Sequence, residues 1–358
     1  MTAKGKPVAA TPLAPPLDQR KAFILATIVY EYVATAEPVG SQTLTQKYNL
    51  GVSSATIRNE MAELEAGGYL VQPHTSAGRI PSDAGYRTYV DRLMQPESLS
   101  SEEAKRIRDE YRAASRELDG VIEQTTRLVG ELAHNVAFMI APSRETQTFR
   151  HIQLIWLAER TGLAVLVTSL GVALQTHFEH SESVTADDLT RLSNRLNASF
   201  GGRTMRELGD VEVIAVVRAA GFGDDLARAV ESAFRSAARS PEPIVASSGT
   251  QHLLDQPEFQ DLRKLRSILR IIEEQKTLYD LVADSINDAG PTVRIGHELG
   301  SDEITECSVV TVPYRFSDQT VGVLAIMGPR RMPYARLMAL AGGTAQSLNK
   351  HFDESERR

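Results

Sequence analysis

The 358-residue sequence has a single cysteine, Cys307, and no apolar run approaching the ~20 residues that span a bilayer. One cysteine excludes an intramolecular disulfide and a cysteine-cluster metal site. The apolar stretch 22–30 is short, precedes Glu31 and lacks a convincing cleavage site, so it fits a first helix better than a signal peptide. We therefore expect a cytoplasmic protein that does not enter the membrane.

Positive charge is also scarce, because the formal net charge is −7. This sign is wrong for a protein that coats nucleic acid indiscriminately. The length suffices for two or three domains that each bury a core. Residues 1–16 are rich in Ala and Pro and are expected to form a disordered tail.

The common catalytic and metal-binding motifs are missing as well. The sequence has no phosphate-binding Gly-x-x-x-x-Gly-Lys loop, no His-Glu-x-x-His and no zinc spacing. His177 and His180 are close together without an evident third ligand, and isolated surface histidines are the more common case. The pair 187–188 is better explained as a helix start than as an acid–base pair, and Cys307 as a core residue. We expect no enzyme, no metal and no cofactor.

The most informative stretch is 52–67, which has the pattern of a helix with one apolar stripe. Ile57, Met61 and Leu64 recur at spacings of four and three and so share a face. Ser53 or Ser54 is a suitable N-cap, and the glycines at 67 and 68 permit a left-handed exit. The outward face of the first two turns carries Ser54, Thr56, Arg58 and Asn59. Arg suits guanine and Asn suits adenine in the major groove, so this helix is a candidate for reading DNA.

The flanking segments predict a helix-turn-helix followed by a wing. A helix is expected over 17–36, a second from Ser41 to Tyr48, and a Gly-containing turn over 49–52. After the candidate helix, 69–71 and 79–80 would pair as a hairpin with a polar tip at 74–78, and Ser82 would cap a further helix. The residues expected to contact DNA are Ser41, Gln42, Lys47, Ser53, Ser54, Thr56, Arg58, Asn59, His74, Ser76 and Arg79.

Charge alone does not favour DNA binding by this region. Between Asp18 and Asp91 there are six basic and eight acidic side chains, a net charge of −2. Binding would depend on where the cations lie, with modest non-specific affinity. The alternative is a winged helix used only for protein contacts.

The rest of the chain predicts a body of mixed helix and sheet. Apolar residues spaced by three and four from 107 to 132 predict a long linker helix over 96–135, packed on its own domain or on a partner subunit. Strands are expected near 152–157, 162–167, 172–178, 211–217, 293–296, 308–312 and 321–327. Helices are expected from Thr185, over 224–238, after Asp255 with Leu262 on its inner stripe, and from Tyr334 to Lys350. Such an α+β layer, with helices on one face of an antiparallel sheet, is of the GAF/PAS kind.

Several motifs resemble the HrcA family of heat-inducible transcription repressors. They are the segments 39–44, 53–61, 64–70 and 72–91, the last containing Pro-His-Thr-Ser-Ala-Gly-Arg-Ile-Pro at 73–81, together with 295–298, 307–310 and 322–334. The resemblance implies a winged helix (17–95), the linker helix, a GAF-like domain (136–189 and 256–358) and an inserted dimerisation subdomain (190–255).

The resemblance also implies a function. A homodimer would bind a double-stranded DNA operator, the CIRCE inverted repeat before chaperone genes, with one winged helix per half-site. A GroE-type chaperonin would keep the repressor active, and heat stress would release it from DNA.

Two rival functions remain. One is a metabolite-responsive repressor of the DeoR type, since the Thr-Ile-Arg element at 56–58 also occurs there, with an effector pocket in the GAF-like domain. The other is a small-molecule enzyme with an accessory winged domain.

Overall fold

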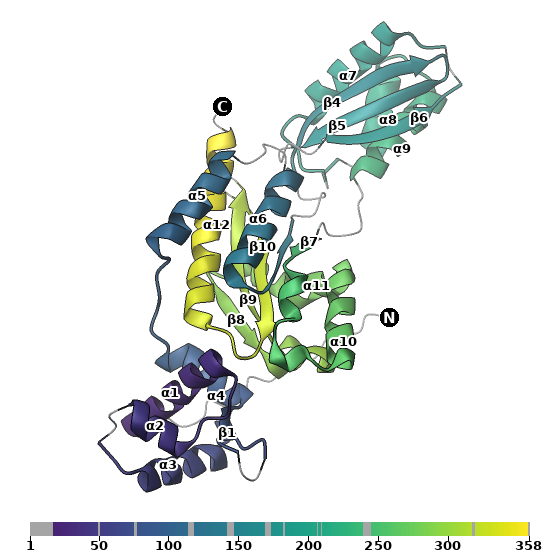
Figure 1. Ribbon diagram of the computed structural model, residues 1–358. Coiled ribbons are helices and arrows are strands. Elements are labelled where there is room, and N and C mark those ends of the chain that lie inside the picture. Colours follow the sequence, from purple (N-terminus) through teal and green to yellow (C-terminus); the bar gives the residue numbers. More distant parts are fainter. Residues whose placement is uncertain are drawn as a thin grey trace. The chain divides into compact units, whose positions relative to one another are not determined.

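The computed structural model divides the chain into two compact units, with the boundary between Gln95 and Pro96 (Figure 1). Each unit is described by itself. The described residues are 17–48, 51–74, 77–113, 118–141, 147–168, 173–181, 183–205, 207–208, 210–238, 245–316 and 319–356. The expected tail at 1–16 lies outside them. Within these ranges, none of the helices combines the length and apolar character needed to cross a membrane.

The N-terminal unit has the element order that the sequence predicts. It comprises α1 (Gln19–Thr35), α2 (Ser41–Lys47), α3 (Ser54–Ala66), β1 (Leu70–Val71), β2 (Ile80–Pro81), α4 (Asp83–Thr88) and a π-helical turn (Tyr89–Leu93). Side chains of Asp18, Ser53 and Ser82 cap α1, α3 and α4 by accepting a backbone N–H. Leu25, Ile28, Leu44, Ile57 and Tyr86 are almost fully buried and form the core between the helices.

The larger unit is built on a five-stranded antiparallel sheet. Its strands are β3 (Val136–Ile140), β7 (Val245–Ser248), β8 (Thr292–Ile295), β9 (Cys307–Phe316) and β10 (Gln319–Pro329), in the order β7-β3-β10-β9-β8.

Helices cover both faces of this sheet, and the expectation of helices on one face only was wrong. α10 (Leu262–Glu273) and α11 (Gln275–Val282) pack on the face that carries Phe138 and Val309. α6 (Leu118–Ala133) and α12 (Tyr334–Glu356) pack on the other face, where Ser308 hydrogen-bonds Tyr334 (Figure 1). Every residue of β3 is buried, as a strand covered on both sides requires.

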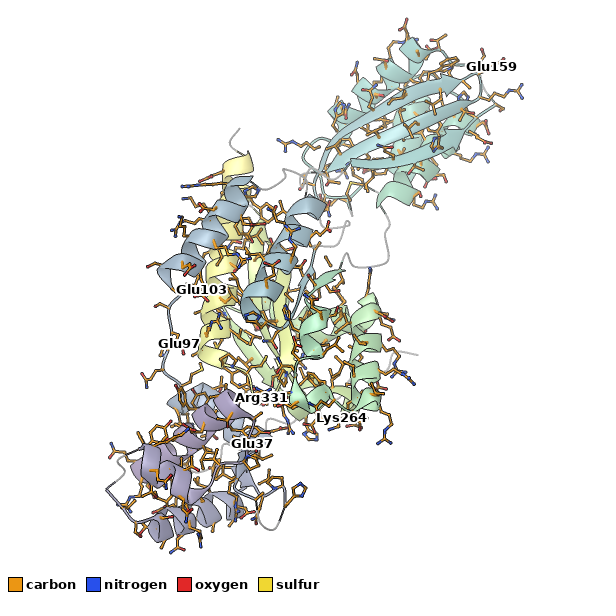
Figure 2. All side chains as sticks on the ribbon, viewed as in Figure 1. Glu37, Glu97, Glu103, Glu159, Lys264 and Arg331 are labelled. Atoms are coloured by element: carbon orange, nitrogen blue, oxygen red, sulfur yellow. The ribbon has the colours of Figure 1, made fainter. Side chains whose placement is uncertain are left out.

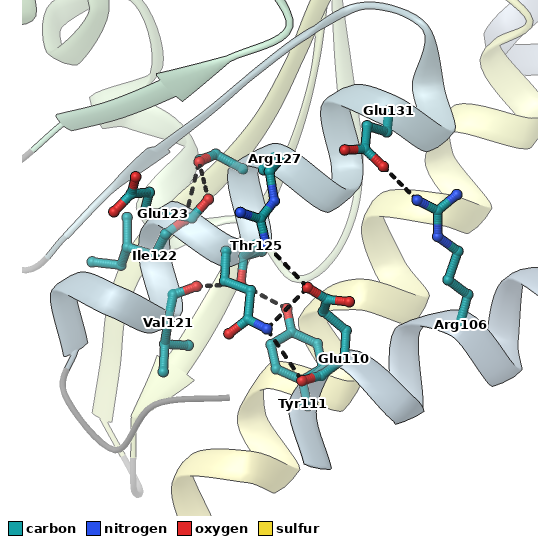
Figure 3. A network of polar contacts seen from close by, with 11 residues as sticks. Arg106, Glu110, Tyr111, Val121, Ile122, Glu123, Thr125, Arg127 and Glu131 are labelled. Carbon is teal, nitrogen blue, oxygen red and sulfur yellow. Dashed lines mark hydrogen bonds and ion pairs between the residues drawn. The ribbon is translucent and has the colours of Figure 1, made fainter. Parts of the chain in front are cut away.

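The predicted linker helix over 96–135 is instead an antiparallel pair, α5 (Ser101–Ala113) and α6 (Figure 3). The Tyr111 hydroxyl lies 2.8 Å from Thr125 Oγ1, and Arg106 is ion-paired with Glu131. Buried Ile107 and Tyr111 face the same unit, and α5 packs on α12, so the intrachain alternative is the observed one. The apolar residues of two successive amphipathic helices recur at the same spacing of three and four, so this spacing did not show that the chain reverses direction between α5 and α6.

Residues 149–238 form a subdomain with a sheet of its own. β4 (Phe149–Ala158), β5 (Thr161–Thr168) and β6 (Ala173–Glu179) pair in that order, and α7 (Ala186–Phe200), α8 (Asp210–Ala219) and α9 (Asp224–Ala238) bury one face of the sheet. The predicted limits of 190–255 therefore place these strands wrongly in the main sheet and β7 wrongly outside it. Strand periodicity shows which face is buried but not which sheet a strand joins.

Two further predictions were wrong. The segment 211–217 is helical, within α8, and buries Val213 and Val217 one helical turn apart. The helix expected after Asp255 is split at Glu274 into α10 and α11, and Leu262 is 73% exposed rather than on the inner stripe. Short 3₁₀ turns complete the unit at Thr250–Leu253, Pro257–Phe259, Ala283–Asn287, Gly296–Leu299 and Asp302–Ile304.

Candidate nucleic-acid interface

The first turns of α3 present the polar face that the sequence predicts. Ser53 is the N-cap, and its hydroxyl accepts from the Thr56 backbone N–H at 3.2 Å. With Ile57 buried in the core, Arg58 and Asn59 are exposed on the outward side. The helix start therefore offers a guanidinium, a carboxamide and hydroxyl groups to a partner.

Ser41 and Ser54 connect the two helices of the predicted helix-turn-helix. Their hydroxyl oxygens are 3.0 Å apart, and Ser41 is buried at the start of α2. Gln42, the next residue, is exposed. The central turn residues 49–50 lie outside the described part of the chain. Ser41 thus lies inside the junction, whereas Gln42 lies on the surface beside α3.

Lys47 ends α2 next to a buried carboxylate that sequence analysis missed. Lys47 Nζ lies 2.6 Å from Glu31 Oε2, and the Tyr48 hydroxyl donates to Glu31 Oε1 at 2.7 Å. Hydrogen bonds from Lys47 and then Tyr48 lower the pKa of Glu31, against the opposing effect of burial. Burial, with the Glu31 carboxylate, raises the pKa of Tyr48 to about 12. The signal available in the sequence was Glu31 itself, an acidic residue within an otherwise apolar stretch of α1.

The hairpin after α3 is short and closely attached to the rest of the unit. Leu70 pairs with Pro81 and Val71 with Ile80. Arg79 pairs with Val39 through two backbone hydrogen bonds and forms an ion pair with Glu65 of α3. His74 is exposed near the tip, and Ser76 lies outside the described residues.

Arg58 differs from the other cations between Asp18 and Asp91. The five other basic residues between Asp18 and Asp91 have an acidic partner: Arg20, Lys21, Lys47, Arg79 and Arg87. Across the described residues, no acidic group lies within ion-pair distance of Arg58. Among the described residues between Asp18 and Asp91, the cation without an acidic partner is thus at the exposed start of α3.

The histidines and the cysteine considered in the sequence are not gathered into a site among the described residues. Among the described residues, no group of three or more His, Cys, Asp or Glu side chains is placed to hold a metal. His177 is exposed on β6, whereas His180 is buried. Burial raises the pKa of the Cys307 thiol to about 12, which opposes thiolate formation.

Comparison with known proteins decides the family. Residues 119–338 match the family described as HrcA protein C terminal domain. A heat-inducible transcription repressor HrcA of Pelotomaculum thermopropionicum is 40% identical over 341 residues, which cover 93% of this chain and 96% of that protein. The chain belongs to the HrcA family. The resemblance that the sequence motifs carry is confirmed.

Another HrcA relative and a solved structure extend over the same length. The heat-inducible transcription repressor HrcA of Clostridium perfringens is 38% identical, with 93% of this chain and 98% of that protein covered. A crystal structure of a hypothetical protein at 2.2 Å resolution is 26% identical with a TM-score of 0.65, covering 95% of this chain and all of that one. The similarity to HrcA proteins thus includes both units.

Proposed function

We propose that this chain is a heat-inducible transcription repressor whose N-terminal unit is a winged helix that binds operator DNA. The observation that carries the proposal is Arg58, an exposed and unpaired cation on the first turns of a helix in helix-turn-helix position. The names of relatives that match nearly the whole chain support the same function. In this arrangement α3 enters the major groove, and the β1–β2 hairpin is the wing.

The proposed contacts divide by chemistry. Arg58, Asn59 and Gln42 have side chains that pair with base edges. Ser53, Ser54 and Thr56 lie at the N-terminal end of α3, where backbone N–H groups favour a phosphate. Lys47 and His74 are placed for the flanking backbone, as is Ser76 by its sequence position. Ser41 acts from inside the α2–α3 junction, through Ser54.

The proposed repressor acts as a homodimer on an inverted repeat of the CIRCE type. Two winged helices double the modest attraction of a DNA-binding region whose net charge between Asp18 and Asp91 is −2. The main sheet with its helices would be a GAF-like domain, and the subdomain at 149–238 its dimerisation insert. Ile155, Leu163, Val165 and Val167 support this assignment, because they lie on the sheet face opposite to the buried core cluster.

Heat release is proposed through the folding of the repressor itself. Native proteins are only marginally stable. A repressor that needs a GroE-type chaperonin to stay folded would therefore lose its DNA-binding form when heat stress diverts the chaperonin to other proteins. The names of the relatives favour this account over a metabolite-responsive repressor.

The direct test measures binding of the full-length protein to a labelled duplex carrying the CIRCE inverted repeat, with a scrambled duplex as competitor. Arg58→Ala is expected to weaken specific binding about 5- to 150-fold, which corresponds to roughly 1–3 kcal/mol for one lost base contact. Arg112→Ala removes the same charge from the exposed surface of α5 and is expected to leave affinity unchanged. Equal affinity of the Arg58 variant and the wild type would remove α3 from the interface.

The heat response needs a second arm. Repressor that has lost operator binding on heating is expected to regain it with GroE-type chaperonin and ATP, and not with chaperonin lacking ATP. Equal recovery in both reactions would contradict the chaperonin's role.

A further inference from the structure

Arg79 is held at the base of the β1–β2 hairpin by a carboxylate of α3. Its Nε donates to Glu65 Oε2 at 2.9 Å, and its Nη2 lies 2.8 Å from the same oxygen. Only 18% of the Arg79 side chain is exposed, against 34% of the Glu65 side chain. A guanidinium that engages one carboxylate through two nitrogens has a defined orientation. Arg79 therefore joins the hairpin to the helix.

The backbone of Arg79 makes a second connection in another direction. Its N–H donates to the Val39 carbonyl and its carbonyl accepts from the Val39 N–H, both at 2.9 Å. The preceding Gly78 lies so close to this segment that a Cβ there would stand 2.4 Å from the Val39 oxygen. Arg79 thus joins three parts of the unit, namely α3, the segment before α2 and the hairpin.

We propose that Glu65 and Arg79 are positioning residues that fix the hairpin against α3, and that Arg79 does not contact DNA itself. The inference rests on the proposed function, because it concerns how the same unit binds its operator. To reach a phosphate, the Arg79 guanidinium would have to give up the contacts that its Nε and Nη2 make with Glu65 Oε2. Glu65 would also remain beside the phosphate as a like charge. The hairpin fixed in this way would carry His74 and the tip to the DNA.

The two possible roles of Arg79 predict opposite effects of neutralising Glu65. If Arg79 bound phosphate, Glu65 would compete for it, and Glu65→Gln would strengthen DNA binding. If the pair positions the hairpin, the same change loosens the hairpin and weakens specific binding. The sign of the effect therefore distinguishes the roles without depending on its size.

The experiment compares full-length variants on the CIRCE duplex over a range of salt concentrations. Glu65→Gln is expected to weaken specific binding about 3- to 10-fold, which is the size of effect that follows from the loss of a partly exposed ion pair. Arg79→Gln is expected to do the same, and the double variant to be no worse than either single one. The slope of log affinity against log salt should be unchanged, whereas loss of one phosphate contact lowers it by about 0.9.

Glu63→Gln is the matched control. It removes the same charge from the same helix, but its carboxylate is 64% exposed and pairs with Lys21 rather than with the hairpin. This variant is expected to bind no more weakly than the wild type. Glu65→Asp, which keeps the charge on a shorter side chain, gives a second test in the same direction if Glu65→Gln does not fold.

The outcomes separate the inference from the function on which it rests. A wild-type protein that does not prefer the inverted repeat to a scrambled duplex would overturn the proposed function and this inference with it. If the wild type shows that preference, unchanged or tighter binding by the Glu65 variants overturns the inference alone. A salt slope lowered by about 1 in Arg79→Gln does so as well.

Discussion

Glu31 shows how one buried acid can fix the end of a helix in the candidate interface. Its carboxylate joins α1 to the end of α2 by accepting from Lys47 and Tyr48. With both partners present the charged form is favoured, and the pKa of Glu31 falls below its usual 4.5. A lowered pKa in the folded state means that the stabilisation is complete above the unfolded value and is lost as pH falls through the folded one.

This sign leads to a pH-dependent prediction for Glu31→Gln. At pH 7 the variant is expected to lose about 1 kcal/mol in the free energy of unfolding, because Lys47 loses a charged partner. The difference from wild type should shrink as pH falls below about 4.5, because the Glu31 carboxylate of the unfolded chain then takes up a proton before that of the folded chain, whose pKa is lower. Urea unfolding at pH 7 and at pH 3.5 measures both values, and a difference that does not change with pH would contradict the prediction.

The exposed half of the candidate interface was predictable and the buried half was not. Ser53, Arg58 and Asn59 follow from an N-cap and an apolar stripe, which are local properties of one helix. The partners Glu31 and Glu65 depend on the approach of side chains that lie 14 to 17 positions apart in the chain. Nothing in local spacing encodes that approach, so Lys47 and Arg79 both appeared to be free cations.

The β1–β2 hairpin depends on the absence of a side chain at Gly78. A Cβ there would meet the carbonyl oxygen and carbon of Val39 at 2.4 and 2.5 Å, and backbone atoms have little room to move. Gly78→Ala is therefore expected to separate the hairpin from the Val39 segment and to lower stability by about 1–3 kcal/mol.

Gly40→Ala is the matched control for this change. It makes the same substitution one residue beyond Val39, where the nearest atom is Thr43 Oγ1 at 4.0 Å. Amide hydrogen exchange is the measurement, and the Val39 and Arg79 amides are expected to exchange faster in the Gly78 variant only. Equal protection of both amides in the two variants would show that the close approach is not required.

The sequence predicted helices and strands best where each element has one clear pattern. The caps of α3, α4 and α7 lie at the predicted residues. The prediction failed in α8, whose apolar run contains three valines and an isoleucine and has the composition of a strand. The segment is nevertheless helical, and Val213 and Val217 pack into the subdomain core. Tertiary contacts here override the strand propensity of the sequence.

The proposed dimer would use a surface that the elements of its own chain leave uncovered. In the subdomain at 149–238, α7, α8 and α9 bury one face of the sheet. Ile155 pairs with Leu163 across the strands of the opposite face, and Ile155 is 39% exposed. Glu159, at the turn that joins these strands, is exposed (Figure 2). An apolar centre on an otherwise polar face is suited to a self-complementary contact between two copies.

Ile155→Asp tests this surface together with the proposed dimer. A carboxylate in an apolar contact would be desolvated without a partner, so the variant is expected to be monomeric by sedimentation, whereas the wild type is expected to be a dimer at the same concentration. Its affinity for the full inverted repeat should fall about 100-fold or more, whereas affinity for a duplex with one half-site should not change. Thr190→Asp adds the same charge at an exposed position of α7, away from the proposed contact, and is expected to leave the dimer intact. A monomer that keeps full affinity for the inverted repeat would show that each winged helix binds without its partner.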